Sequence, residues 1–477
     1  MMFRNNKALA AIMCALAVSA SSCGSVAENG ESKSETTTTA ATAAPQTETE
    51  TETTATAAET TTTSKNTEPE EVPPEEKDSD GITPYTEIKP CMKNGEFAAA
   101  MTQFTADLYR QTTIYGESVG KGALAGENDL ISGCSAMLAF GMCANGMDGN
   151  TLEETLTALR MKDLDTLNSN AGTLMSKFEG EDAVMKAANG IWINSEHTFK
   201  TKQDYLDFCA EKFKSDVNFK PFNDTTKDEI NSWVSDKTHG MIPSVIDSFD
   251  DDQVMALINC ICFEDTWQDQ IEEENVNDGI FKAADGSEQK CQMLHGGEKS
   301  YNSNDTFEGF VKKYSDSDFY FAAMLPYEGV TIDQAINSLS AESIADFLYR
   351  KNDNVDVNYR IPEFTYDYDT SLSESMMGLG CLEAFESGNF HKMLEYSDEN
   401  GETVNISSSL QKTHIEFDRH GTKAAAATHV GVTAAGAAIK PVRQKKTIVF
   451  DRPFMYMIVY HGEDGDFPVF IGTVNKI

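Results

Sequence analysis

The chain is rich in side chains that could do chemistry, but no catalytic arrangement selects any of them. It holds 77 Asp and Glu residues, so a paired-carboxylate hydrolase is compatible with the composition, yet no spacing singles out a pair. The nucleophile elbow GxSxG, a phosphate-binding Walker loop and GxGxxG are all absent. The histidines and cysteines show no HExxH, HxxxH or CxxC spacing. We therefore predict a protein that is not an enzyme and that needs no metal or cofactor.

The stretch most unusual in its chemistry is a peptide, residues 421–439, with almost no residue larger than Val, no carboxylate and one Lys. Nothing in it could anchor a loop in a core, so we expect it to be exposed. Its residues nevertheless alternate like a strand with one buried face, while Lys423, His429 and Thr433 fall on the other. The small, mostly apolar residues on the face expected to be buried are Thr422, Ala424, Ala426, Thr428, Val430, Val432 and Ala434. An Ala-rich helix or a flexible linker is the alternative.

The flanking residues place this peptide inside a fold. Residues 448–460 and 467–477 are two apolar runs typical of closing strands, and Gly421 frees the backbone to bend just before the peptide. Together, GTKAAAAT, FDRPFMYMIVY and FPVFIGTV resemble the hinge, reactive loop and C-terminal strands of serpins, protease inhibitors that act by loop insertion. The resemblance implies an α+β fold with three β-sheets, about eight or nine helices, and an exposed reactive-centre loop at about 421–443.

Three further segments carry the resemblance. Ser132 and Ser135 occupy the positions of the small-residue shutter under the main sheet, although an ordinary helix start with a Ser N-cap explains them equally well. Asn259 and Trp267 match residues lining the sheet where the loop enters, and a plain core strand is the alternative. The third segment matches NxWVxxxTxGxI through Asn231, Trp233, Val234, Thr238, Gly240 and Ile242.

The chain departs from the family at three positions. Gly133 stands where Pro is usual, Gln411 where a His commonly bridges the shutter, and Arg419 where inhibitory members typically have an acidic residue. Gln can still donate and accept hydrogen bonds. The last two substitutions bear on how easily the loop inserts.

The resemblance also implies a mechanism and a reactive bond. A serine protease would cleave the loop and remain attached as a covalent acyl complex while the cut loop joins the main sheet. Counting about fourteen residues past Gly421 places this bond at Ala435–Gly436, which suits elastase-like or subtilisin-like proteases; Lys440 or Arg443 would suit a trypsin-like one. The hinge is Gly421, Thr422, Ala424, Ala425, Ala426, Ala427 and Thr428. The alternatives are a non-inhibitory serpin-fold binding protein at the cell surface and a secreted hydrolase.

The N-terminal residues are typical of export. Arg4 and Lys7 precede an apolar run, residues 8–20, that is too short to span a bilayer as a stop-transfer helix. Residues 20–23 resemble the cleavage box of bacterial lipoproteins, so we expect a signal over 1–23 and lipid attachment at Cys23; an ordinary secretory signal is the alternative. Residues 24–84 are rich in Thr, Glu, Ser and Ala and are predicted to form a disordered tether.

Composition bounds the remaining possibilities. Residues 85–477 read as one folded domain, which we expect to be monomeric and extracellular. The net charge of −39 argues against nucleic acid and against anionic partners, and the short basic cluster at 440–446 follows the loop. Two of the ten cysteines, Cys14 and Cys23, lie in the signal, and we expect most of the other eight to be small buried hydrophobes.

Overall fold

The computed structural model describes residues 10–22, 95–178, 183–315, 317–397, 402–422 and 443–477. All of these residues belong to the larger of the two units into which the chain divides. The predicted tether, Cys23 and the loop from 423 to 442 lie outside the described residues. The fold below is that of the larger unit.

The first helix forms because its apolar residues recur at helical spacing. Helix α1 (Glu96–Ser118) buries Phe97, Met101, Phe104 and Leu108, which recur at helical spacing. The carboxylate of Asp464 accepts hydrogen bonds from the backbone nitrogens of Phe97 and Ala98, at 3.0 Å each. A carboxylate there satisfies backbone donors that the first helical turn leaves unpaired.

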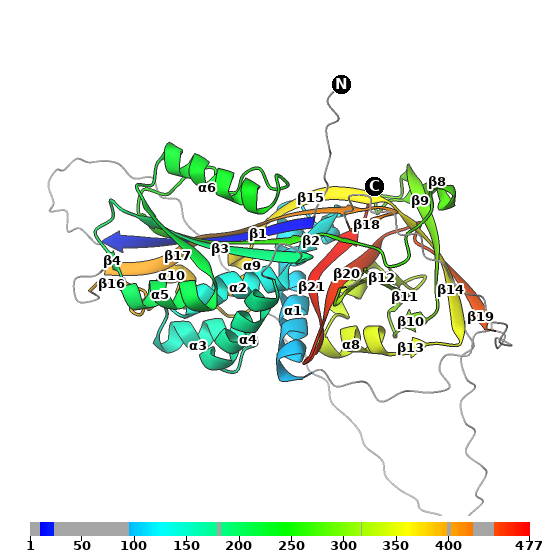
Figure 1. Cartoon of the computed structure of the whole chain (residues 1–477), viewed down its shortest axis with the longest axis horizontal. Helices are drawn as coiled ribbons and strands as arrows, with labels where there is room; N and C mark the ends of the chain where they lie inside the picture. Colours follow the sequence, from blue (N-terminus) through cyan, green and yellow to red (C-terminus); the bar gives the residue numbers. More distant parts are fainter. Residues whose placement is uncertain (1–9, 23–94, 179–182, 316, 398–401, 423–442) are drawn as a thin grey trace, which may run out of the picture. The chain divides into compact units, whose positions relative to one another are not determined.

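The central sheet has six strands, and its order is not the order of the sequence. The strands follow one another as β15 (Phe364–Ser371), β17 (Glu402–Phe417), β1 (Ala10–Ser22), β6 (Gln253–Phe263), β3 (Met185–Asn194) and β5 (Ser215–Lys220). The apolar N-terminal run thus lies as a strand between β17 and β6, antiparallel to both, as Figure 1 shows in blue. The sequence predicts an export signal there and gives no indication of this pairing.

Helices cover both faces of this sheet. Helix α2 (Gly133–Ala144) lies against one face and α6 (Asp224–Lys237) against the other (Figure 1). Every residue of β6 is buried. On the α6 side, Ile230 and Val234 pack with Ile258, Cys260 and Cys262 in one apolar cluster. A strand covered on both faces is apolar throughout rather than alternating.

The NxWVxxxTxGxI segment ends α6 and returns the chain to the core. The side-chain oxygen of Asn231 accepts hydrogen bonds from the backbone nitrogens of Val245 (2.7 Å) and Ile246 (3.0 Å). Gly240 has φ +85°, a left-handed conformation that favours glycine after a helix end. Ile242 is buried beneath the returning chain.

Two more large sheets complete the fold. The seven-stranded sheet runs β13 (Lys351–Asn352), β10 (Tyr301–Ser303), β11 (Phe307–Lys313), β12 (Phe319–Pro326), β20 (Phe454–Gly462), β21 (Gly465–Val474), β2 (Asp129–Ile131). The four-stranded sheet runs β19 (Gln444–Val449), β14 (Val355–Pro362), β9 (Glu288–Glu298), β8 (Val276–Lys282). Two short pairs join β16 (Leu394–Glu395) to β4 (Lys200–Thr201), and β18 (Gly421–Thr422) to β7 (Asp265–Thr266).

Within the described residues there are ten α-helices, against the eight or nine expected from the sequence. The remaining seven are α3 (Gly149–Ala158), α4 (Leu164–Lys177), α5 (Gln203–Lys212), α7 (Ile332–Asn337), α8 (Ala341–Tyr349), α9 (Ser373–Gly378) and α10 (Glu383–Glu386). Helices α7, α9 and α10 have six residues or fewer, too short for a periodic apolar pattern to reveal. The α+β class with three large sheets is confirmed.

Seven of the cysteines predicted to be buried thiols are described, and all seven are buried and not in disulfides: Cys134, Cys143, Cys209, Cys260, Cys262, Cys291 and Cys381. Cys91 lies outside the described residues. Of the helices that the structure describes, none combines the length and apolarity needed to cross a membrane.

A buried carboxylate ties the shutter segment to the C-terminal strand. Asp129 starts β2, three residues before Ser132, and is 1% exposed. It accepts hydrogen bonds from the hydroxyl of Tyr109 (2.5 Å) and from the backbone nitrogens of Ala123 (2.8 Å) and Thr473 (3.1 Å). Burial outweighs these bonds and raises the pKa of Asp129 to about 6.

This pKa predicts a pH dependence of stability. Because the folded pKa lies above the unfolded value of 3.8, folding takes up a proton between these values. The contribution of Asp129 is fully present below pH 3.8 and is lost as the pH rises through about 6, by roughly 3 kcal/mol at 1.36 kcal/mol per unit. Denaturant unfolding from pH 3.5 to 7 should show most of this loss in the parent chain and none of it in Asp129→Asn. Parallel pH profiles for the two proteins would contradict it.

Candidate functional site

The hinge is built around a tight turn at the end of β17. After Phe417, Asp418 accepts hydrogen bonds through its carboxylate from the backbone nitrogens of His420 (2.7 Å) and Gly421 (3.1 Å). The backbone nitrogen of Asp418 donates to the carbonyl oxygen of Gly421 at 3.1 Å. An Asp side chain that bonds the backbone ahead of it is a common way to fix a turn.

From this turn the chain enters β18, which pairs with β7. A Cβ atom on Gly421 would lie 2.2 Å from the carbonyl oxygen of Asp265, so the close approach of the two backbones requires glycine. Thr422 is fully buried, and its hydroxyl is 2.5 Å from the hydroxyl of Tyr314. Burial raises the pKa of Tyr314, so the phenol keeps its proton. The first two hinge residues are therefore held in place by packing.

Trp267 clamps the same turn. Its indole Nε1 donates to the carbonyl oxygen of Asp418 at 2.9 Å, and its backbone nitrogen donates to the carbonyl oxygen of His420 at 2.9 Å. The ring stacks on Tyr314 with centroids 4.6 Å apart and meets Phe417 edge-on at 5.5 Å. The side chain is 1% exposed. Trp267 thus joins β7, the strand before the hinge and the hinge turn.

Arg419 lies in the turn but takes no part in this clamp through its side chain. Its guanidinium lies 3.9 Å from the carboxylate of Glu273, and its side chain is 31% exposed. Its carbonyl oxygen accepts a hydrogen bond from the backbone nitrogen of Ile271. The departure at position 419 therefore changes surface charge beside the hinge and leaves the buried contacts intact.

A buried polar network lies beneath the middle of the central sheet. Ser132 caps α2 by accepting from the backbone nitrogen of Ser135 (3.0 Å), and the Ser135 hydroxyl donates to Asn259 (2.5 Å). The side-chain amide of Asn259 donates onward to Asn189 at 2.8 Å. Gln411 accepts from the backbone nitrogen of Ser132 at 3.0 Å and donates to its carbonyl oxygen at 3.1 Å. All five residues are at most 1% exposed.

The strand between β6 and β17 crosses this network; we call its position the strand slot. In the backbone register, Cys14 pairs with Asn259 on one side and with Gln411 on the other. Both neighbours belong to the polar network. The slot therefore runs directly between the two strands that the network connects through α2.

The structure brings the sequence-predicted residues together in two groups. Ser132, Ser135, Asn259 and Gln411 form the network, and Trp267 meets Gly421 and Thr422 at the hinge turn. The Ser N-cap interpretation holds at Ser132 alongside the network. Arg443 is described after the loop, with its guanidinium 2.7 Å from Asp356. The rest, Ala424, Ala425, Ala426, Ala427, Thr428, Ala435, Gly436, Lys440 and Cys23, lie outside the described residues.

Sequence reasoning missed three residues of the site. Tyr314, Asp418 and Asn189 each bond a predicted residue, but they come from segments that match no motif. An Asp two residues before His420 and three before Gly421 is a turn signal that could have indicated Asp418. Tyr314 and Asn189 are recognisable only through tertiary contacts.

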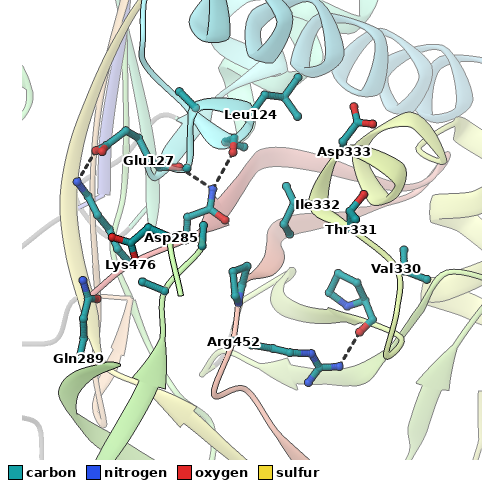
Figure 2. A pocket seen from close by; sticks show the side chains of 18 residues that line it. Leu124, Glu127, Asp285, Gln289, Val330, Thr331, Ile332, Asp333, Arg452 and Lys476 are labelled. Atoms are coloured by element: carbon teal, nitrogen blue, oxygen red, sulfur yellow. Dashed lines mark hydrogen bonds and ion pairs between the residues drawn. The ribbon is translucent and has the colours of Figure 1, made fainter. Parts of the chain in front are cut away.

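A cavity of about 770 Å³ lies elsewhere and involves none of these residues. Figure 2 shows its polar lining: Glu127 forms an ion pair with Lys476, and Arg452 donates to the carbonyl oxygen of Pro326 at 2.8 Å. Asp285 and Asp333 also line it. Its charged groups are of both signs, and the cavity does not contribute to the hinge or the network.

Comparison with known proteins identifies the class. The family model described as Serpin (serine protease inhibitor) matches residues 99–477. The native-state crystal structure of tengpin, a thermophilic serpin, superposes with a TM-score of 0.68 at 30% identity, covering 80% of this chain and 94% of tengpin. The chain belongs to the serpin family.

Curated relatives agree with this assignment. Glia-derived nexin of Rattus norvegicus is 28% identical over 378 residues, covering 73% of this chain and 88% of the relative. An uncharacterized serpin-like protein of Thermococcus kodakarensis is 26% identical over 377 residues, covering 77% and 82%. Leukocyte elastase inhibitor of Xenopus laevis is 24% identical over 376 residues, covering 76% and 94%. Some relatives are thus named as inhibitors.

The network predicts a cost for removing the Gln411 amide. In Gln411→Leu the buried backbone nitrogen and oxygen of Ser132 lose their partner, which should lower the free energy of unfolding by about 1–3 kcal/mol. Gln411→His keeps one donor and one acceptor and should lose less. Urea unfolding of the three proteins measures the difference. An unchanged midpoint in Gln411→Leu would show that the network carries no net stability.

The clamp predicts a local effect at Trp267. Trp267→Phe keeps an aromatic stack on Tyr314 but leaves the carbonyl oxygen of Asp418 without the indole donor. A loss of about 1.4 kcal/mol or more in local opening free energy corresponds to at least tenfold faster amide exchange at residue 267. Hydrogen exchange should show this acceleration while the amide of Leu257 in β6 is unchanged. Equal acceleration at both amides would indicate global loosening instead.

Proposed function

We propose that this chain is a suicide-substrate inhibitor of serine proteases whose cleaved loop inserts into the strand slot. The observation that carries the proposal is the six-stranded central sheet. Between β6 and β17 it accommodates a thirteen-residue strand, antiparallel to both, and the hinge leaves β17 at the end of that slot. Family membership and the name leukocyte elastase inhibitor, which two relatives carry, support it.

The register of the slot supports the length of the inserted segment. Asp418 and Gly421 face each other across the turn. If the chain ran back along β17 from this turn, Ala425, four residues after Gly421, would lie opposite His414, four residues before Asp418. His414 is the present partner of Ala11. Opposite Ala17 and Val18 of β1, β17 contains one extra residue, a bulge. Allowing for this bulge, eleven further residues of the loop would bring Gly436 opposite Glu402, the present partner of Ser22. The slot would thus be filled at about the predicted reactive bond.

The chemistry of the first step belongs to the protease. Its serine oxygen would attack the carbonyl carbon of Ala435, and the bond to the nitrogen of Gly436 would break after that nitrogen receives a proton from the protease's imidazole. The protease would then be held as an ester of Ala435. Small residues at this bond suit the shallow primary pocket of elastase-like or subtilisin-like enzymes.

Insertion of the cleaved loop into the sheet would supply the free energy that drives the inhibitory change. A segment of about fourteen residues that gains on the order of ten backbone hydrogen bonds at about 1 kcal/mol each gains as much free energy as many domains have in total. The uncleaved inhibitory form would then persist through a kinetic barrier rather than as the lowest state. The buried clamp of Trp267 and Tyr314 on the hinge is one contribution to that barrier.

The site of action would be outside the cell. The basic start and apolar run of residues 1–23 and the box before Cys23 are the features of an exported, lipid-anchored protein. Residues 24–84 would then hold the inhibitor domain away from the surface. A protease acting on the cell from outside would meet the loop there.

A protease assay tests the function. Residues 24–477 mixed with pancreatic elastase should give an adduct that survives SDS, and a released C-terminal peptide that begins at Gly436 by mass spectrometry. The adduct follows from an ester that outlasts loop insertion. A peptide beginning after Lys440 or Arg443 would contradict the small-pocket assignment. Cleavage without any adduct would favour the non-inhibitory serpin-fold alternative.

A hinge variant separates insertion from recognition. Thr422→Arg places a charged side chain at a fully buried position, so the loop should still be cut while insertion is blocked. We expect the adduct to fall at least tenfold relative to cleaved product. Thr447→Arg at an exposed position in β19 is the matched control and should leave the ratio unchanged. An unchanged ratio in Thr422→Arg would exclude insertion through this hinge.

A further inference from the structure

The occupant of the strand slot comes from the chain's own N-terminus. Residues 10–22, which we call the leader strand, form β1. Twelve of them are in register with β17, from Ala11 opposite His414 to Ser22 opposite Glu402, and ten are in register with β6. Both edges of the leader strand are therefore paired over most of its length, as for an integral strand of the sheet.

The composition of the leader strand suits this position. Residues 10–22 contain no charged residue, no Pro and no Gly, and five of the thirteen are Ala. A strand in the middle of a sheet must donate on both edges, which excludes Pro from its interior. An apolar run with the features of an export signal thus also meets the requirements of an interior strand.

The direction of the leader strand makes it a competitor of the reactive loop. It runs antiparallel to β17, as would any segment that turns back after Asp418 and continues from Gly421. It also lies over the same polar network, with Cys14 between Asn259 and Gln411. Each backbone donor and acceptor on the inner edges of β6 and β17 can serve one strand at a time.

We propose that the strand slot is a binding site for the leader strand, and that this intramolecular contact keeps the unprocessed chain from inhibiting proteases. The binding itself rests on the described strands; its consequence for inhibition rests on the proposed function. While residues 10–22 occupy the slot, a protease that cuts the loop finds no place for the loop to insert, deacylates and leaves. Removal of the leader strand by signal processing vacates the slot and switches inhibition on.

A crosslinking experiment on the full chain tests the binding without any protease. Ala15 pairs with Leu410, a β17 residue that is 38% exposed. The test variant carries Ala15→Cys and Leu410→Cys, and the control carries Leu16→Cys and Leu410→Cys; in both, Cys14 and Cys23 are replaced by Ser. A one-residue shift in register puts paired side chains on opposite faces of a sheet. A short bifunctional thiol reagent spans directly paired Cβ atoms, about 5 Å apart.

We expect at least tenfold more intramolecular crosslink in the test variant than in the control, with the linked peptides identified by mass spectrometry. Equal yields, or no crosslink in either variant, would overturn the proposal. Crosslinked dimers on a non-reducing gel would also overturn it, because the occupant would then come from a second copy of the chain.

A second experiment tests the consequence. Ala15→Pro with Ala17→Pro removes two backbone donors from the leader strand in the full chain, and Thr38→Pro with Ala40→Pro in the tether is the matched control. The first variant should form at least tenfold more SDS-resistant adduct with elastase than the parent chain, and the control should equal the parent. An adduct already at full yield in the parent chain would overturn the blocking role. If processed chain and proline variant both form no adduct while the register-specific crosslink forms, the proposed function fails and the binding of the leader strand stands.

Discussion

The constraint on which the rest of the structure depends is the pairing of the inner edges of β6 and β17. Both strands lie in the interior of the sheet, so the backbone groups on these edges pair with a neighbouring strand. In this structure the leader strand supplies those partners along nearly the whole slot. One slot accepts one strand. The proposed inhibition therefore depends on which segment occupies the slot at the time the loop is cut.

The polar network lies at the middle of the slot, beside the edges of β6 and β17 that must be paired. Under the proposed mechanism β6 and β17 exchange one strand between them for another, and interlocking apolar side chains would oppose this exchange at a large packing cost. Ser135, Asn259 and Gln411 instead connect β6 and β17 through the start of α2 by short, directional hydrogen bonds. At the hinge the arrangement is the reverse, because Trp267 and Tyr314 fix the chain by stacking and burial. A separable centre and a firmly held hinge together define where insertion would begin.

Much of this arrangement could be predicted from the sequence where local rules decide. The helical spacing of Phe97 and Leu108 predicts α1, and Gly421 indicates the bend before residues 422–434. The resemblance places Gln411 at the position that bridges the shutter, and its amide bonds the backbone of Ser132. The leader strand could not be predicted, because an uncharged apolar run after Arg4 and Lys7 has the same local pattern whether it enters a membrane or a sheet. Its partners lie more than 230 residues away in the sequence, in β6 and β17, and no local signal marks them. Tyr314 was missed for the same reason.

The leader strand can enter either a membrane or the strand slot, and it cannot be in both at once. An apolar segment gains free energy by leaving water, and both a membrane and the strand slot offer that gain. The segment can enter a membrane only before the domain folds around it. The slot, in contrast, exists only after residues 253–263 and 402–417 have come together. If the proposed export preceded folding, the chain would lose the segment and the slot would be vacant, whereas a chain that folded first would fill it. Under the two proposals, the order of export and folding would decide which strand lies in the sheet, and with it whether the chain can inhibit proteases.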